Sequence, residues 1–402
     1  MSSYVDLLKT PGVARIIAAQ LTARFPSGML SLAYLLHVER VHDSYAAAGL
    51  VLAATSVGQA VAGPLTSRWM GVWGMRKVLT LTLIVCAASI ISIGLIPMSI
   101  PMYMIVGFIG GLSTPPIQPA VRTIYPKMVN SRQLTPLFAL DASAQEIIWV
   151  AGPVITTFVA LQVSTALAIL IAGAFLIVGG IWFILSPEVG RVRIPRSTRS
   201  FGTVLARPAV LLATITGFLL VAAAAAIEVG VVAVFGHGGP EAGLVLAIWA
   251  VGSLAGGLSL GHLPIGPWAL ARRMFVVFVG MALAMFGLNF WWLAFALLIA
   301  GIGIAPALAV IFAIVSSSVK FSDTAEAYGW VGTGQLIGAA VGSATAGFLI
   351  DANGAIGGFW AAASFALFGF LVPTILRRWH PDLRGREVGP IADTEPVPVQ
   401  PS

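Results

Sequence analysis

The chain is organised around residues 140–153, which read LDASAQEIIWVAGP. With its apolar flanks the stretch is long enough for a helix to cross the hydrocarbon core of a bilayer. It nevertheless carries two carboxylates, Asp141 and Glu146, and a charge at the centre of such a helix costs roughly 2.5–3.5 kcal/mol. Ionisable groups placed there usually serve the movement of ions or substrates. Gly152 and Pro153 end the stretch, and we expect a helix bend there because Pro153 has no N–H to donate.

Composition places the rest of the chain in a membrane as well. Of its 402 residues, 58% are hydrophobic and only 9% are charged, against about 25% in soluble proteins. The formal net charge of +7 would also fit nucleic-acid binding, but the basic residues lie in short loops between apolar runs, where membrane topology explains them. The sequence therefore predicts an all-α membrane protein that binds no nucleic acid.

Apolar stretches of about 20 residues predict twelve membrane-spanning helices. They cover residues 13–36, 44–69, 77–97, 101–124, 136–160, 163–186, 209–235, 241–262, 270–288, 291–315, 324–350 and 355–376. All Lys and Arg residues except Arg24 and Arg40 then fall on the side that holds both ends of the chain. Because basic loops stay in the cytoplasm, we expect both termini to be cytoplasmic and the chain to be a multi-pass protein of the cell membrane.

The twelve spans divide into two halves. The longest internal loop, residues 187–208, carries five arginines and separates residues 1–186 from residues 209–379. Residues 57–63 (VGQAVAG) echo residues 251–257 (VGSLAGG) at corresponding places in the two halves. Such repeats are typical of secondary transporters, in which two pseudo-symmetric bundles rock around a central site. Residues 380–402 are rich in proline and acidic residues and are predicted to be a disordered tail.

The loop after the second span resembles motif A of the major facilitator superfamily. Residues 63–77 keep the leading glycine, Arg68 and the closing basic pair Arg76-Lys77, with Ser67 where the family has an aspartate. In the family this motif helps to latch the two halves together. The resemblance implies that Arg68, Arg76 and Lys77 act as a gate or charge latch.

Two further segments bear on the same resemblance. Residues 151–153 (AGP) resemble the core of motif C, which the family associates with antiporters. The fourth span lacks the arginine of motif B, since residues 106–111 read VGFIGG. The resemblance covers about residues 10–380. It implies the twelve-helix major facilitator fold, a monomer, and a central cavity that opens alternately to either side.

Three membrane-embedded charges are candidates for coupling. Arg24 and Glu146 both lie about ten residues into their spans, roughly 15 Å deep, and the first and fifth spans are neighbours in the family. We expect them to pair and protonation of Glu146 to release Arg24; the alternative is a permanent structural ion pair. Asp141 lies on another face of its helix, because five residues rotate it by about 140°. Its expected partner is Arg122, either as an inner gate or latch or as part of a proton relay.

The resemblance places the central cavity between the first, fourth, seventh and tenth spans. The side chains expected to line it are mostly aromatic and carry almost no charge: Phe25, Phe108, Trp149, Phe218, Phe312 and Gln335. A cavity for sugar phosphates or dicarboxylates would present several cations. The lining therefore favours a hydrophobic or amphiphilic substrate, although packing explains Trp149 equally well.

Other chemistries find no support in the sequence. The five histidines form no pair at metal-ligand spacing, and there is no Gly-x-x-x-x-Gly-Lys-Ser/Thr phosphate loop. We therefore expect no metal, no cofactor, no direct use of ATP and no enzymatic activity.

The sequence thus predicts a secondary active transporter. We expect it to export hydrophobic or amphiphilic small molecules by proton-coupled antiport. The export direction rests on the resemblance to motif C. One alternative is a proton symporter for the uptake of a small carboxylate or neutral solute, in which Arg24 binds the substrate carboxylate. Another is a membrane partner or lipid-handling protein that uses the fold without transport.

Overall fold

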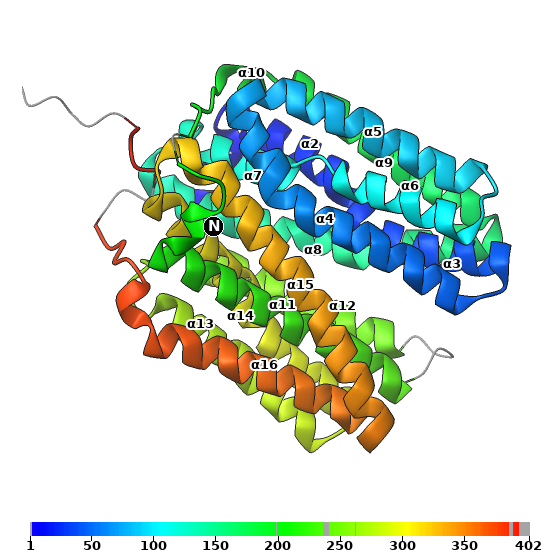
Figure 1. Cartoon of the computed structure of the whole chain (residues 1–402). Helices are drawn as coiled ribbons and strands as arrows, with labels where there is room; N and C mark the ends of the chain where they lie inside the picture. The colour runs from blue at the N-terminus through cyan, green and yellow to red at the C-terminus, as the bar shows by residue number, and fades with distance from the viewer. Residues whose placement is uncertain (1, 198, 236–240, 262, 386–388, 394–402) are drawn as a thin grey trace, which may run out of the picture.

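The computed structural model describes residues 2–197, 199–235, 241–261, 263–385 and 389–393 (Figure 1). The N-terminal half contains α1 (Ser2–Lys9), α2 (Val13–Arg24), η1 (Phe25–Gly28), α3 (Leu30–His42), α4 (Tyr45–Trp73), α5 (Met75–Leu95), α6 (Ile100–Leu112), α7 (Ile117–Ile124), η2 (Tyr125–Lys127), α8 (Ser131–Gln162) and α9 (Thr165–Leu185). The linker contains α10 (Pro187–Arg191) and η3 (Thr203–Ala206). The C-terminal half contains α11 (Pro208–Phe235), α12 (Glu241–Leu260), α13 (Ala269–Leu283), η4 (Ala284–Phe286), α14 (Phe290–Ser318), α15 (Phe321–Asn353), α16 (Ile356–Ile375) and η5 (Arg377–Trp379).

Eleven of the described segments are helical, long and apolar enough to cross a membrane, so the all-α membrane fold is confirmed. The predicted first span is absent from this set, and it is not one continuous α-helix. It consists of α2, the 3₁₀ turn η1 and α3, and it extends to His42 rather than ending at residue 36. Pro26 and Gly28 lie in the turn, and proline cannot donate a helical hydrogen bond. The broken segment completes the twelve.

The fourth span is also broken, at residues 113–116 between α6 and α7. The double proline Pro115-Pro116 removes two consecutive N–H donors there. The tenth span, by contrast, continues as one helix through Pro306. Gly110 precedes Pro115, and Gly301 precedes Pro306, by the same five residues, but only the fourth span is broken near its proline.

Polar side chains fix where several long helices begin. Ser44, Asn130, Ser164 and Asn289 each accept a hydrogen bond from the backbone N–H three residues later. Capping of this kind satisfies one of the donors that the first turn of a helix leaves unpaired. These caps terminate short turns between antiparallel neighbours, which keeps consecutive spans side by side.

The linker and the chain after α16 lie at the same end of the bundle, which we call the linker side (upper left in Figure 1). Part of the predicted disordered tail is ordered there. Ile391 exchanges backbone hydrogen bonds of 3.0 Å with Val319 and Phe321, and Asp393 accepts a 3.2 Å bond from the N–H of Ser322. These hydrogen bonds hold this part of the tail against the turn between α14 and α15. Residues 386–388 and 394–402 lie outside the described part of the chain.

The two halves meet closely toward the linker side. Gly63 of α4 faces Gly329 of α15, and a Cβ built on Gly329 would lie 2.5 Å from the carbonyl oxygen of Gly63. One turn away, the hydroxyl of Thr333 donates a 2.7 Å bond to the carbonyl of Ala60. Small residues allow this approach, as is usual where membrane helices pack, and the structure is closed on this side.

Replacing Gly329 with alanine should therefore destabilise the closed structure. The added methyl group meets backbone rather than a movable side chain, and overpacking of this kind costs about 1–3 kcal/mol. Gly332→Ala is a matched control, because a Cβ at Gly332 meets nothing within 4 Å. We expect a lower midpoint of thermal unfolding for Gly329→Ala and an unchanged or higher midpoint for Gly332→Ala. Equal midpoints for the two variants would show that the glycine contact is unimportant.

Candidate functional site: two buried carboxylates with different partners

Asp141 of α8 is fully buried at the centre of a polar network within the N-terminal half. Nε of Arg122 lies 3.3 Å from its Oδ2, and Nη1 of Arg24 lies 3.6 Å from its Oδ1. The amide of Gln20 and the hydroxyl of Tyr125 donate to Oδ1 at 2.9 and 3.2 Å. The predicted contact between Asp141 and Arg122 is confirmed. These donors compensate the buried carboxylate for the loss of water.

Arg24 pairs with Asp141, so the expected pair with Glu146 is wrong. Asp141 and Gln145 are four residues apart and share one face of α8, whereas Glu146 is rotated by about 100° from Gln145. Arg24 ends α2, where its guanidinium donates to the side-chain oxygens of Gln20, at 2.8 Å, and of Gln145. Arg24 thus reaches the level of Gln145, the neighbour of Glu146, but it lies on the side of α8 that carries Asp141 and Gln145.

Arg122 connects this network to the other half. It is only 1% exposed, and its guanidinium carbon lies 3.3 Å from the ring centroid of Phe312 and 5.9 Å from that of Tyr328. Cations bind aromatic faces at such distances. Gln118, with its amide oxygen turned toward the guanidinium groups, accepts from Arg24 and Arg122 at 2.6–3.2 Å. Two guanidiniums thus share one carboxylate, which leaves one positive charge in excess.

Glu146 has different surroundings. Its Oε1 accepts a 2.7 Å hydrogen bond from the hydroxyl of Ser253 on α12, so the contact joins the two halves. Among the described residues Glu146 forms no ion pair. Glu228 of α11 lies close enough for the two carboxylates to interact electrostatically. The sequence did not point to Ser253, because residues 251–257 indicated only an internal repeat between the two halves.

Arg68, predicted as a latch residue, does cross between the halves. Its Nη1 lies 2.7 Å from Oε2 of Glu326, near the start of α15. The other oxygen of Glu326 accepts a 2.7 Å bond from the backbone N–H of Gly202 in the linker. The carboxylate is nearly buried, so α4, α15 and the linker converge on it.

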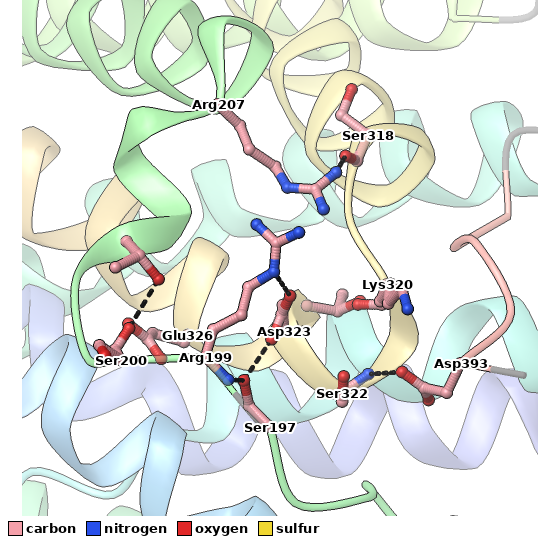
Figure 2. A network of polar contacts seen from close by, with 12 residues as sticks. Ser197, Arg199, Ser200, Arg207, Ser318, Lys320, Ser322, Asp323, Glu326 and Asp393 are labelled. Carbon is pink, nitrogen blue, oxygen red and sulfur yellow. Dashed lines mark hydrogen bonds and ion pairs between the residues drawn. The ribbon is translucent and has the colours of Figure 1, made fainter.

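The linker is fastened to α15 at a second point (Figure 2). Asp323 accepts a 2.5 Å bond from the hydroxyl of Ser197 and lies 3.7 Å from Nε of Arg199. Asp323 and Glu326 lie near the start of α15, where carboxylates interact favourably with the helix N-terminus. The structure gives both carboxylates specific partners as well.

The remaining latch candidates do not bridge the halves. Arg76 donates to the carbonyls of Ile184 and Ser186 at 3.1 and 3.3 Å, which caps the end of α9 within its own half. Lys77 is exposed. Of the motif A residues, Arg68 therefore contacts the opposite half, whereas Arg76 binds its own half.

The predicted cavity residues separate into packed and exposed groups. Phe25 stacks on Phe175 of α9 with centroids 4.7 Å apart, and Phe312 is buried beneath Arg122, so neither expectation of an open lining holds. Trp149 and Phe108 are exposed. Gln335 and Phe218 are partly buried.

Gly152 and Pro153 lie inside α8, which continues as one helix to Gln162. A Cβ on Gly152 would lie 2.8 Å from the backbone of Gly28 in η1. Gly152 thus lets the broken first span pack against α8, while a bend at this point stays a prediction.

No group of three or more metal-ligating side chains occurs in the part of the chain that the structure describes.

Replacing Asp141 with asparagine should destabilise the protein strongly. The substitution keeps the size of the side chain but leaves Arg24 and Arg122 buried without a carboxylate, and breaking a buried pair in this way costs about 3–5 kcal/mol. Asp351→Asn, at an exposed carboxylate in the last turn of α15, is the control. Thermal unfolding of the purified proteins measures the difference. Unfolding of Asp141→Asn at the temperature of the control would contradict the role given to Asp141.

The comparisons with known proteins agree with this architecture. The family model described as Major Facilitator Superfamily matches residues 16–288 and 235–400. No curated protein sequence matches the chain.

Two solved structures have the same fold. The human organic anion transporter MFSD10 (TETRAN) superposes with a TM-score of 0.69 at 16% identity, covering 90% of this chain and 100% of the other. A bacterial homologue of the iron transporter ferroportin, in an outward-facing state, superposes with a TM-score of 0.72 at 11% identity, covering 90% and 98%. The chain belongs to the Major Facilitator Superfamily, whose fold and structural neighbours are those of membrane transporters.

Proposed function

We propose that this transporter is a proton-coupled exporter of hydrophobic or amphiphilic small molecules, with Glu146 as the proton-coupling residue. The observation that carries the proposal is the hydrogen bond from Ser253 to Glu146. It places a carboxylate without an ion-pair partner among the described residues at the junction of the two halves. A change in the charge of Glu146 therefore acts directly on the contact between them.

The coupling follows from the cost of an unpaired charge in an apolar interior. Ionised Glu146 needs the Ser253 hydroxyl as a donor, whereas protonated Glu146 has lost the charge that made this bond strong. Protonation thus weakens one of the links that hold α8 against α12. A ligand or proton shifts a two-state equilibrium only by its differential affinity for the two states, and this contact differs between them because it spans the halves.

Asp141 differs from Glu146 in that its partners do not lie in the opposite half. Its donors Arg24, Arg122, Gln20 and Tyr125 all lie in the N-terminal half, so they move with it as a rigid block. The network holds α2, α7 and α8 together while α12 moves past Glu146. We therefore assign Asp141 and Arg24 a positioning role and Arg68 the role of a latch on the linker side.

The substrate class is inferred from the groups near Glu146. Trp149, one turn further along the same face of α8, is exposed and offers an aromatic surface to an apolar ligand. Glu146 and Glu228 offer carboxylates to a cationic group. An amphiphilic cation that competes with the proton at this place fits antiport, with both termini of the chain in the cytoplasm.

Replacing Glu146 with glutamine should abolish proton-driven transport. Inverted membrane vesicles that contain the protein are given an inward-acid gradient and a fluorescent amphiphilic cation such as ethidium. We expect the wild type to accumulate the dye and to lose it when an uncoupler collapses the gradient. Glu146→Gln, which mimics the protonated side chain, should show at most one tenth of the wild-type rate.

Glu241→Gln, at an exposed carboxylate that begins α12, is the matched control and should transport normally. Accumulation by Glu146→Gln that still depends on the pH gradient would reject Glu146 as the coupling residue.

The second candidate function is proton symport of a small carboxylate. It is favoured by the excess positive charge of Arg24 and Arg122 over Asp141, because a substrate carboxylate would balance it. Right-side-out vesicles distinguish the two functions. Uptake of a radiolabelled monocarboxylate that is driven by external acid and lost in Arg24→Gln would favour symport over export.

A further inference from the structure

A second concentration of charge lies on the linker side of the C-terminal half, away from Glu146 and Asp141. A cavity of about 480 Å³ opens between the α12–α13 loop, the first turn of α13 and the chain after α16. Helices α13 and α16 pack against each other and form an outer edge of the bundle (Figure 1). Four arginines line the cavity, namely Arg272, Arg377, Arg378 and Arg384.

Among the described residues, few carboxylates balance this positive charge. Asp382 is the one carboxylate among the described residues of the cavity wall, and Arg384 donates to it at 2.7 and 2.9 Å. Arg377 stacks over the ring of Trp268, 5.1 Å from its centroid. The guanidiniums of Arg272 and Arg378 have no hydrogen bond or ion pair with any described residue. The cavity therefore contains two guanidinium groups whose N–H donors can bind a phosphate group.

His380 lies in the same wall and carries a buried ring nitrogen without a partner among the described residues. It is only 4% exposed, and its Nδ1 lies 2.7 Å from the carbonyl oxygen of Pro381. A carbonyl can only accept, so Nδ1 carries the proton. Burial lowers the pKa of His380 below its usual value, so the ring is neutral near pH 7. Nε2 is then an acceptor, and it has no hydrogen-bond partner among the described residues.

Exposed apolar side chains lie next to the cavity, as is expected where a protein binds a lipid headgroup. Phe275, one turn along α13 from Arg272, is 46% exposed, and Ile375, just before Arg377, is 73% exposed. These apolar side chains continue the helices that carry the arginines toward the membrane interior. A ligand that fits both the arginines and these apolar side chains has a phosphate group at the arginines and acyl chains along α13 and α16.

We propose that this cavity binds the headgroup of an anionic glycerophospholipid whose phosphate is esterified to a polyol, as in phosphatidylglycerol. The phosphate lies between Arg272 and Arg378, and a headgroup hydroxyl donates to Nε2 of His380. Zwitterionic lipids such as phosphatidylcholine lack the hydroxyl and carry a cation that the arginines repel. Phosphatidic acid supplies the phosphate without the hydroxyl.

Native mass spectrometry of the full-length protein in detergent tests the site. The wild type is titrated with phosphatidylglycerol, phosphatidic acid and phosphatidylcholine of identical acyl chains, and with glycerol 3-phosphate as a soluble phosphate without acyl chains. We expect phosphatidylglycerol to bind most tightly, about tenfold more tightly than phosphatidylcholine, as the loss of charge-assisted phosphate contacts implies. The double substitution Arg272→Gln/Arg378→Gln should remove this preference. His380→Phe should remove the preference for phosphatidylglycerol over phosphatidic acid.

The matched control is Arg191→Gln/Arg193→Gln, which removes two exposed arginines from the linker side outside the cavity. It should bind phosphatidylglycerol as the wild type does. The proposal is overturned if the control loses binding to the same extent as Arg272→Gln/Arg378→Gln, or if neither does. Binding of glycerol 3-phosphate as tight as that of phosphatidylglycerol would overturn the assignment to a lipid and identify a soluble phosphate site.

Discussion

An ionised carboxylate inside a membrane protein must be matched by donors, and the rest of this structure depends on how that constraint is met. Asp141 is matched completely, by two arginines, a glutamine and a tyrosine of its own half. Glu146, five residues further along α8, receives a hydrogen bond from Ser253 of the opposite half. One carboxylate therefore stabilises a rigid block, while the other depends on how two blocks are placed. This difference, rather than depth in the membrane, separates a structural charge from a candidate for coupling.

The breaks in the first and fourth spans make the Asp141 network possible. Helix α2 ends at Arg24, where η1 begins, and the side chain of Arg24 there reaches Gln145 of α8. The interruption at residues 113–116 starts a separate helix, α7, that carries Gln118 and Arg122 toward α8 and Phe312. Close contacts between glycines, at Gly28 and Gly152 and at Gly63 and Gly329, then bring the helices near enough for these polar side chains to meet.

Sequence reasoning predicted the features that follow from hydropathy and charge. Apolar stretch length predicted the membrane-spanning segments with ends that differ from the observed ones by up to six residues, and the Asp141–Arg122 contact followed from depth alone. The partner of Arg24 was missed because helical depth does not say which side of α8 faces α2. Ser253 and Gln20 were missed because neutral polar residues carry no distinctive pattern within apolar helices. Phe25 and Phe312 were assigned to the cavity by span number, yet the break after α2 turns Phe25 toward α9, and the ring of Phe312 serves Arg122.

The central claim is that the charge state of Glu146 sets the relative position of the two halves. Double electron–electron resonance between spin labels at Gly49 on α4 and Asp351 on α15, both exposed on the side opposite the linker, tests it most directly. The account predicts that acidification shifts the distance distribution in the otherwise wild-type protein, and that Glu146→Gln shows the acid distribution at every pH. An identical pH-dependent shift in Glu146→Gln would contradict it.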